Sequence, residues 1–285
     1  MRELSVIGGN GVRLVADAYG DPTHAPVLLL HGGGQTRHSW RNTARDLALA
    51  GFFAVSADHR GHGDSGWDPD GDYEWSRFRE DMEAWSAELG GAPAVVGASL
   101  GGMTALLTAG SRILEGKDAA MGAIVLVDIG PKVEMEGSDK IVGFMGARPD
   151  GFTSLEEAAD VIAEYLPHRP RPKDTSGLAK NLRLHPDGRY RWHWDPAFIS
   201  NINERRAARA EGSLDEYARA LNIPALLVRG RQSDLLSEEG ARYFLDLCPH
   251  AEYVDVAGAG HMVAGDKNDA FTNGVVEFLS RVVAH

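Results

Sequence analysis

The sequence predicts a doubly wound α/β fold with a mostly parallel sheet, and two observations predict it. Short apolar runs alternate with segments of helical periodicity along most of the chain. The apolar runs are continuous, which is typical of parallel strands that are covered on both faces. Strands that alternate with helices in this way assemble into a layered α/β architecture.

We expect eight strands. The first two form a hairpin through Gly8-Gly9-Asn10-Gly11, with strands near 4–7 and 12–19. The other strands are expected at 27–30, 52–57, 94–96, 123–127, 225–228 and 253–256, and the helices between them at 39–50, 76–89, 100–112, 237–247 and 269–283. Ligands bind outside the carboxyl ends of the strands in such a sheet, so the polar residues that follow these runs mark the expected site.

The alternation of strands and helices stops between residues 131 and 221, where no clear buried strand is present. Two capping boxes, Ser154-Leu155-Glu156-Glu157 and Ser213-Leu214-Asp215-Glu216, begin helical patterns there. We therefore expect a core domain of residues 1–130 and 222–285, with a helical cap of residues 131–221 inserted after the sixth core strand. The aromatic residues of Trp192-His193-Trp194-Asp195-Pro196 either line a substrate pocket or pack the cap core.

Composition excludes several classes of partner. The 285 residues carry a formal net charge of -12, which disfavours binding to nucleic acid and to anionic membrane surfaces. The single cysteine, Cys248, cannot form an intramolecular disulfide, and we expect it to pack as a small apolar side chain. The first ten residues lack the apolar stretch of a signal peptide, and no segment is long enough to cross a bilayer. We therefore expect a cytoplasmic location; the sequence does not indicate the oligomeric state.

The segment Gly97-Ala98-Ser99-Leu100-Gly101 follows an apolar run and precedes a helical one. This G-x-S-x-G pattern is typical of a sharp strand-to-helix turn that exposes the serine hydroxyl at the edge of the sheet. The flanking glycines remove side chains that would clash in so tight a turn. A helix-capping serine is the structural alternative, but the glycines and the partners described next favour a nucleophile.

A serine nucleophile needs an adjacent base, and histidine suits that task because its pKa lies near neutral pH. His261 follows a predicted strand, in Gly258-Ala259-Gly260-His261. Asp234 follows another, in a position to orient the histidine. The competing histidines are His31, His38, His59 and His62. The sequence therefore predicts Ser99, His261 and Asp234 as a catalytic triad.

Four segments together resemble the α/β-hydrolase superfamily, in the branch of small esterases, cofactor-free haloperoxidases, epoxide hydrolases and C–C bond hydrolases. They are His31-Gly32-Gly33-Gly34, Asp58-His59-Arg60-Gly61-His62-Gly63-Asp64-Ser65, the serine turn and Gly260-His261. The resemblance covers essentially the whole chain, and the chain order serine, aspartate, histidine is the one expected for this fold. It implies an eight-stranded sheet and structural roles around the site for His31 and the loop at 59–62, and we expect Asp58 and Arg60 to order that loop through hydrogen bonds.

The resemblance also bears on individual residues. It implies an oxyanion hole made by the backbone N–H groups of Leu100 and Gly33, with Gly34 as the alternative to Gly33. Some members of the superfamily place the triad acid at the end of the preceding strand, so Asp128 is the rival of Asp234. We favour Asp234, because Asp128-Ile129-Gly130-Pro131 is typical of a hinge into the cap.

These residues predict a serine hydrolase that cleaves a small or medium carboxylic ester through an acyl-enzyme. Perhydrolysis, haloperoxidase-like chemistry and C–C bond hydrolysis on the same triad are alternatives, and a ligand receptor on a hydrolase fold is the non-enzymatic one. The serine at position 99 disfavours epoxide hydrolases and haloalkane dehalogenases, which use an aspartate there. The sequence has no metal-ligand spacing and no phosphate-binding or dinucleotide motif, so we expect no metal and no cofactor.

Overall fold

The computed structural model describes residues 1–166, 171, 173–200, 202, 213–261, 263 and 268–283. Its main sheet has eight strands in the order β1-β2-β4-β3-β5-β6-β9-β10. The strands are β1 (Arg2–Ile7), β2 (Arg13–Tyr19), β3 (Pro26–Leu30), β4 (Phe53–Ala57), β5 (Ala94–Ala98), β6 (Ala123–Val127), β9 (Ala225–Gly230) and β10 (Glu252–Val256). The pairs β1–β2 and β2–β4 are antiparallel and all other pairs are parallel, so the predicted fold class is confirmed.

Alternate residues of the central strands face opposite sides of the sheet, and each side has its own helical layer. Leu28, Val95 and Ile124 belong to one apolar cluster, while their neighbours Val27 and Val96 belong to the other. The first cluster is covered by α2 (Trp75–Glu88), α3 (Leu100–Leu114), α8 (Ser213–Ala220) and α9 (Glu238–Leu247). The second is covered by α1 (Arg41–Leu49) and α11 (Asn268–Val282). Continuous apolar runs are required because both faces of these strands are buried.

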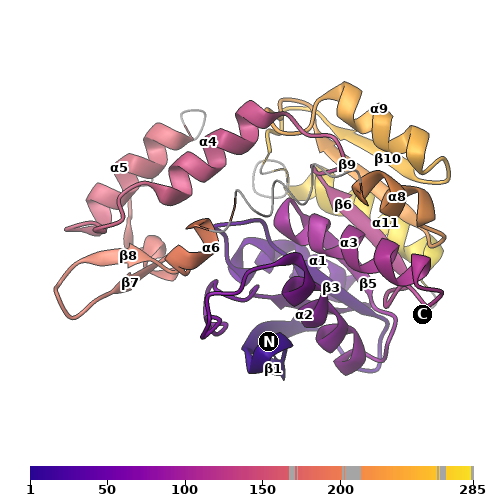
Figure 1. Cartoon of the computed structure of the whole chain (residues 1–285), viewed down its shortest axis with the longest axis horizontal. Coiled ribbons are helices and arrows are strands. Elements are labelled where there is room, and N and C mark those ends of the chain that lie inside the picture. The colour runs from indigo at the N-terminus through magenta and orange to yellow at the C-terminus, as the bar shows by residue number, and fades with distance from the viewer. Residues whose placement is uncertain are drawn as a thin grey trace.

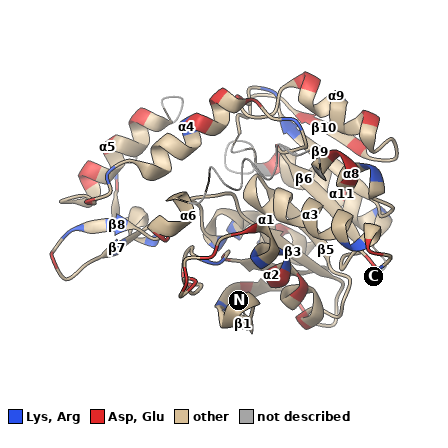
Figure 2. Cartoon of the chain, viewed as in Figure 1, with Lys and Arg blue, Asp and Glu red and all other residues tan. Residues whose placement is uncertain are grey.

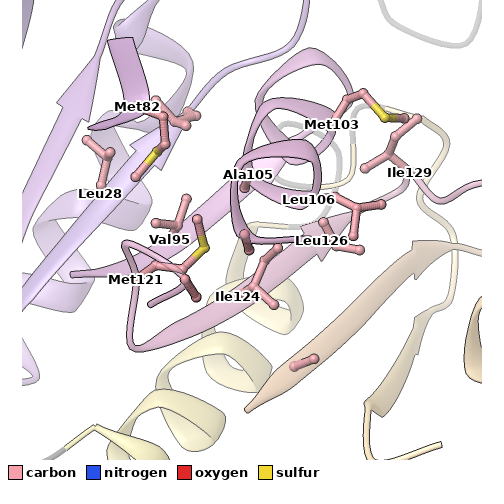
Figure 3. Packing of buried hydrophobic residues seen from close by; sticks show 14 of the residues in the cluster. Leu28, Met82, Val95, Met103, Ala105, Leu106, Met121, Ile124, Leu126 and Ile129 are labelled. Carbon is pink, nitrogen blue, oxygen red and sulfur yellow. The ribbon is translucent and has the colours of Figure 1, made fainter. Parts of the chain in front are cut away.

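Helix α3 lies centrally on the first face, directly after the serine turn. Figure 3 shows Met103 and Leu106 of α3 beside Leu126 and Ile129, at and after the end of β6. Cys248 is buried in the same cluster with 1% of its surface exposed, as the sequence predicted. Burial of this helix fixes the direction in which the chain leaves Ser99.

The cap follows β6, where the sequence placed it. It contains α4 (Met135–Gly146), α5 (Leu155–Tyr165), α6 (Pro196–Ser200) and the antiparallel strands β7 (Leu182–Leu184) and β8 (Tyr190–Trp192). Figure 1 shows α4, α5 and the β7–β8 hairpin on one side of the molecule, away from β1 and the C-terminus. The Ser154 hydroxyl accepts a hydrogen bond of 3.1 Å from the Glu157 N–H, so this capping box is confirmed.

Two expectations about the cap are wrong. The cap is not entirely helical, because β7 and β8 form an antiparallel hairpin. Its loop contains Asp187-Gly188, which is a typical hairpin signal. The two strands were not predicted because they are too short to show a clear period. Helix α8, expected in the cap, packs on the core, where Leu214, Ala218 and Leu221 share a cluster with Leu106 of α3. A capping box predicts a helix but not the surface on which it packs. The side chain of Ser213 lies outside the described residues.

Acidic side chains are spread over both the cap and the core. Figure 2 shows them on α4 and α5 as well as on α9. No helix in the described ranges is both long and apolar enough to span a membrane. That nucleic acid and anionic membrane surfaces are not partners stays a prediction.

The cap docks on the loop of residues 58–65 through polar contacts. The Gly63 N–H donates a hydrogen bond of 2.8 Å to Nδ1 of His193, and the Arg183 guanidinium donates one of 2.8 Å to the Gly63 carbonyl. The Asp195 N–H donates to the Gly61 carbonyl at 2.8 Å, and the Tyr73 hydroxyl donates to the Asp195 carboxylate at 2.6 Å. These contacts hold the cap over the carboxyl ends of the strands.

Buried imidazoles lie at and beneath this contact. His31, His59 and His193 are almost completely buried, and the His62 ring lies 5.8 Å from that of His193. Burial lowers the pKa of His31 to about 4, and it lowers the pKa of His59 and of His193 well below the ordinary 6.5. All three are therefore neutral in the folded protein at pH 7.

This arrangement predicts an acid-sensitive fold. Between about pH 6.5 and pH 4 the unfolded chain binds protons that the folded chain excludes, so the free energy of unfolding must fall as pH is lowered. Each such histidine contributes up to about 1.4 kcal/mol per pH unit. Asn at position 193 keeps an acceptor for the Gly63 N–H and does not titrate. We therefore expect the stability difference between wild type and His193→Asn, measured by urea unfolding, to narrow from pH 7.5 to pH 5.

The exposed His24, in the turn after β2, supplies the control. His24→Asn should leave the slope of stability against pH at its wild-type value. If His193→Asn also kept the full wild-type slope, the imidazole of His193 would not be one of the groups that destabilise the protein in acid.

Candidate active site

Ser99 stands at a strained turn between β5 and α3. Its backbone angles are φ 47° and ψ -109°, a conformation that costs a non-glycine residue about 1–3 kcal/mol. The Ser99 N–H donates to the Val127 carbonyl at 3.2 Å, and the Gly101 N–H donates to the His31 carbonyl at 3.2 Å. Ser99 occupies the N-cap position of α3 but makes no side-chain capping bond there, so the capping alternative is not supported.

Two glycines allow this turn. A methyl group at Gly97 would overlap the backbone of Gly101, and one at Gly101 would overlap the carbonyl of Leu30. Larger residues would therefore push the helix away from the strand ends. The prediction that the flanking glycines remove clashing side chains is confirmed.

His261 is held by Asp128, not by Asp234. The Nδ1 atom of His261 lies 2.7 Å from Oδ2 of Asp128, which directly follows β6 and is completely buried. The Asp128 carboxylate also accepts hydrogen bonds from the Ser233 hydroxyl and, at 3.0 Å, from the Gly230 N–H. Three donors therefore fix the carboxylate, which in turn orients the imidazole.

The prediction that Asp234 lies beside His261 is wrong. The Asp234 side chain is half exposed and accepts a hydrogen bond of 3.0 Å from Lys140 of α4. Partial burial raises the pKa of Asp234, but the hydrogen bond and charge of Lys140 outweigh it and hold this pKa below its ordinary value. The loop after β9 turns so that Ser233 faces Asp128. The strands β6 and β9 are adjacent and end at one edge, so position after a strand did not distinguish the two acids.

The glycine-rich loop after β3 lies against Ser99. A methyl group at Gly32 would lie 3.4 Å from Cβ of Ser99. The Gly32 N–H donates to the Gln35 side chain at 3.0 Å, and the Gly34 N–H donates to Nε2 of His62 at 3.2 Å. Within the described part of the chain, the N–H groups of Gly33 and Leu100 have no acceptor. This favours Gly33 over Gly34 as the donor that remains for a substrate.

Buried ion pairs order the segment of residues 58–65 behind this loop. The Arg37 guanidinium bonds to Asp58, and the Arg37 N–H donates to the same carboxylate at 2.6 Å. Arg60 is completely buried and binds Asp81 through two hydrogen bonds, of 2.7 and 2.6 Å. A paired buried charge of this kind is structural, which agrees with the roles that the resemblance implied for this segment.

Two cavities meet at Ser99. The smaller, of about 120 Å³, is lined by Leu100, Met103, Ile129, Val142 and Leu235 among others. The larger, of about 470 Å³, is lined by His261 and by the cap residues Tyr165, Lys180, Asn181, Trp192 and Trp194 among others. Ser99 and Gly33 line both cavities. Trp192 and Trp194 also belong to a buried cap cluster, so they both pack the cap and line a pocket.

Ser99 and His261 line one cavity, and His261 is bonded to Asp128. The described residues contain no group of three or more His, Cys, Asp or Glu side chains that could hold a metal ion. Sequence reasoning found Ser99, His261 and the glycine loop. It named Asp128 only as the rival acid and missed Ser233, which no sequence signal marks.

Known proteins share this architecture. A model of the alpha/beta hydrolase fold family matches residues 25–267. Esterase Rv0045c of Mycobacterium tuberculosis is 30% identical over 252 residues, which cover 85% of this chain and 78% of that protein. The 2-hydroxy-6-oxo-6-(2'-aminophenyl)hexa-2,4-dienoic acid hydrolase of Metapseudomonas resinovorans is 26% identical over 267 residues, which cover 90% of this chain and 84% of that protein. A solved alpha/beta hydrolase from Novosphingobium aromaticivorans superposes with a TM-score of 0.81 at 26% identity, covering 99% and 98%.

The family match spans β3 to β10 and therefore includes the serine turn, Asp128 and His261. The parallel strands of the sheet and the strand-to-helix turn at Ser99 lie within the matched segment. This chain belongs to the α/β-hydrolase fold family.

Proposed function

We propose that this protein is a carboxylic ester hydrolase that forms an acyl-enzyme on Ser99. The observation that carries the proposal is the shared cavity. Ser99 and His261 line it together, and His261 is bonded to the buried Asp128. The relative named as an esterase supports this reaction class.

Acylation begins when His261 takes the proton of the Ser99 hydroxyl. The oxygen then forms a bond to the ester carbonyl carbon, and the carbonyl π electrons move to the oxygen as an oxyanion. The N–H groups of Gly33 and Leu100 stabilise this charge, because they need no reorganisation to donate to it. When the intermediate collapses, the bond to the leaving oxygen breaks and His261 donates its proton to that oxygen.

Deacylation repeats these steps with water. His261 removes a proton from a water molecule that attacks the acyl carbonyl, and the proton is then returned to Ser99 as the acid departs. The Asp128 carboxylate stabilises the imidazolium that forms in both halves of the reaction. This role is assigned to Asp128 in place of Asp234, because only Asp128 contacts His261.

C–C bond hydrolysis is the second candidate, since one relative is named as a hydrolase of a dienoic acid. The same serine and histidine would serve both reactions. Turnover of that dienoic acid at a rate above that of every ester tested would favour the second candidate.

The first test is the Ser99→Ala variant. Removing the nucleophile should lower kcat for p-nitrophenyl acetate by at least about 10³-fold, because the acyl-enzyme can no longer form. A fluorophosphonate probe should label the wild type at Ser99 and leave the variant unlabelled. Ser280→Ala, an exposed serine on α11, is the control and should behave as wild type in both assays. Full activity of Ser99→Ala would refute the nucleophile, and an unlabelled, inactive wild type would favour a ligand receptor.

The second test compares two aspartates. Asp128→Asn keeps an acceptor for the Gly230 N–H but presents an amide to His261, which disfavours the productive tautomer, so kcat should fall by about 10³–10⁴-fold. Asp234→Asn loses only a half-exposed ion pair with Lys140 and should stay within about threefold of wild type. The kcat of each variant is measured with p-nitrophenyl acetate as the substrate. A large loss in Asp234→Asn with a small loss in Asp128→Asn would reverse the assignment.

A further inference from the structure

The two cavities at Ser99 differ in a way that bears on substrate choice. Leu100, the second oxyanion donor, lines only the smaller cavity. His261 lines only the larger one. Ser99, Gly33, Ile141 and Met145 line both cavities. A carbonyl bound at Ser99 therefore has one cavity on each side for its two substituents.

The chemistry of the reaction decides which substituent goes where. His261 must donate a proton to the leaving oxygen, so that oxygen has to lie on the histidine side of the tetrahedral carbon. The alcohol portion therefore occupies the larger cavity. The acyl chain, attached on the opposite side of the carbonyl, occupies the smaller one.

The smaller cavity limits the acyl chain in both size and polarity. Its volume of about 120 Å³ is below the roughly 150 Å³ of an apolar cavity that holds benzene. Apart from Ser99 and Ser138, its described lining side chains are apolar or aromatic, and none of them is charged. A carboxylate on the acyl chain would lie there among apolar side chains without a counter-ion, which costs free energy of desolvation.

The larger cavity suits a broad and flat alcohol. Trp192 and Trp194 stack with ring centroids 4.7 Å apart and an interplanar angle of 12°. Phe144 and Tyr165 stack at 4.1 Å and 14°. Both pairs contribute to the lining, and Lys180 and Asn181 add polar groups. Aromatic walls of this kind bind flat groups through stacking.

We propose that the preferred substrates are esters of an uncharged, apolar acid of up to about five carbons with a bulky, aromatic-bearing alcohol. The inference rests on the proposed function, because it assumes an acyl-enzyme on Ser99. It assigns the cavity lined by Val142 to the acid and the cavity lined by Gly177 to the alcohol.

The test uses esters whose alcohols have similar intrinsic reactivity. The acetate, butyrate and octanoate of 2-(1-naphthyl)ethanol vary the acid, and ethyl butyrate varies the alcohol. In the wild type, kcat/KM for the naphthylethyl octanoate should be at least about tenfold below that for the butyrate, since an apolar pocket too small for an acyl chain discriminates against each excess methylene by about tenfold or more. The wild-type series keeps the proposal falsifiable even if a variant fails to fold.

Three variants then separate the cavities. Val142→Phe should lower kcat/KM for the naphthylethyl butyrate by about tenfold and that for the acetate by less than about threefold. Gly177→Phe should lower kcat/KM for the naphthylethyl esters by about tenfold relative to kcat/KM for ethyl butyrate. A Cβ atom at position 177 would meet no other atom within 4 Å, so the backbone has room for the substitution. Gly143→Phe, next to Val142 on α4 but outside both linings, is the control and should change neither ratio.

The outcomes are distinguishable. Ester turnover with the reversed pattern, in which Val142→Phe discriminates alcohols and Gly177→Phe discriminates acids, overturns the inference and leaves the proposed function standing. Equal turnover of octanoate and butyrate by the wild type does the same. Absence of ester turnover together with absence of fluorophosphonate labelling at Ser99 overturns the proposed function, and the inference with it.

Discussion

The strained turn at Ser99 is the constraint on which the site depends. A positive φ at a serine persists only where the surroundings determine it, and here both neighbouring strands contribute. The Val127 carbonyl, at the end of β6, accepts the Ser99 N–H, and the His31 carbonyl, after β3, accepts the Gly101 N–H. The residues that follow these two carbonyls are Asp128 and the glycine loop. The hydrogen bonds that hold the turn therefore also place Asp128 and the glycine loop beside it.

A second layer of polar contacts supports the glycine loop from behind. His62 accepts the Gly34 N–H, while buried Arg37 and Arg60 fix the segment that carries His62. The cap reaches the same segment through His193. The glycine loop and the cap are thus anchored on one set of residues. Three almost completely buried imidazoles, those of His31, His59 and His193, lie at or beneath this anchor.

Much of the architecture could be predicted, because the signals involved are local. Continuous apolar runs identified the central strands, and each strand of the main sheet lies within about two residues of its expected range. The insertion after β6 was found because the alternation stops there. The hairpin β7–β8 was missed, since three-residue strands carry no clear period. Helix α8 was assigned to the wrong layer, since an amphipathic pattern does not specify which apolar surface it meets.

The sequence by itself determined the fold class, the turn at Ser99 and the positions of His261 and the glycine loop. Each of these features depends on residues that are contiguous or that directly follow a strand end. Only the tertiary structure decided that Asp128 rather than Asp234 meets His261. The two acids follow adjacent parallel strands, and the path of a short loop turns Asp234 towards Lys140 and Ser233 towards Asp128. The tertiary structure also decided the division of the site into two cavities, because the walls of these cavities come from core and cap segments far apart in the chain.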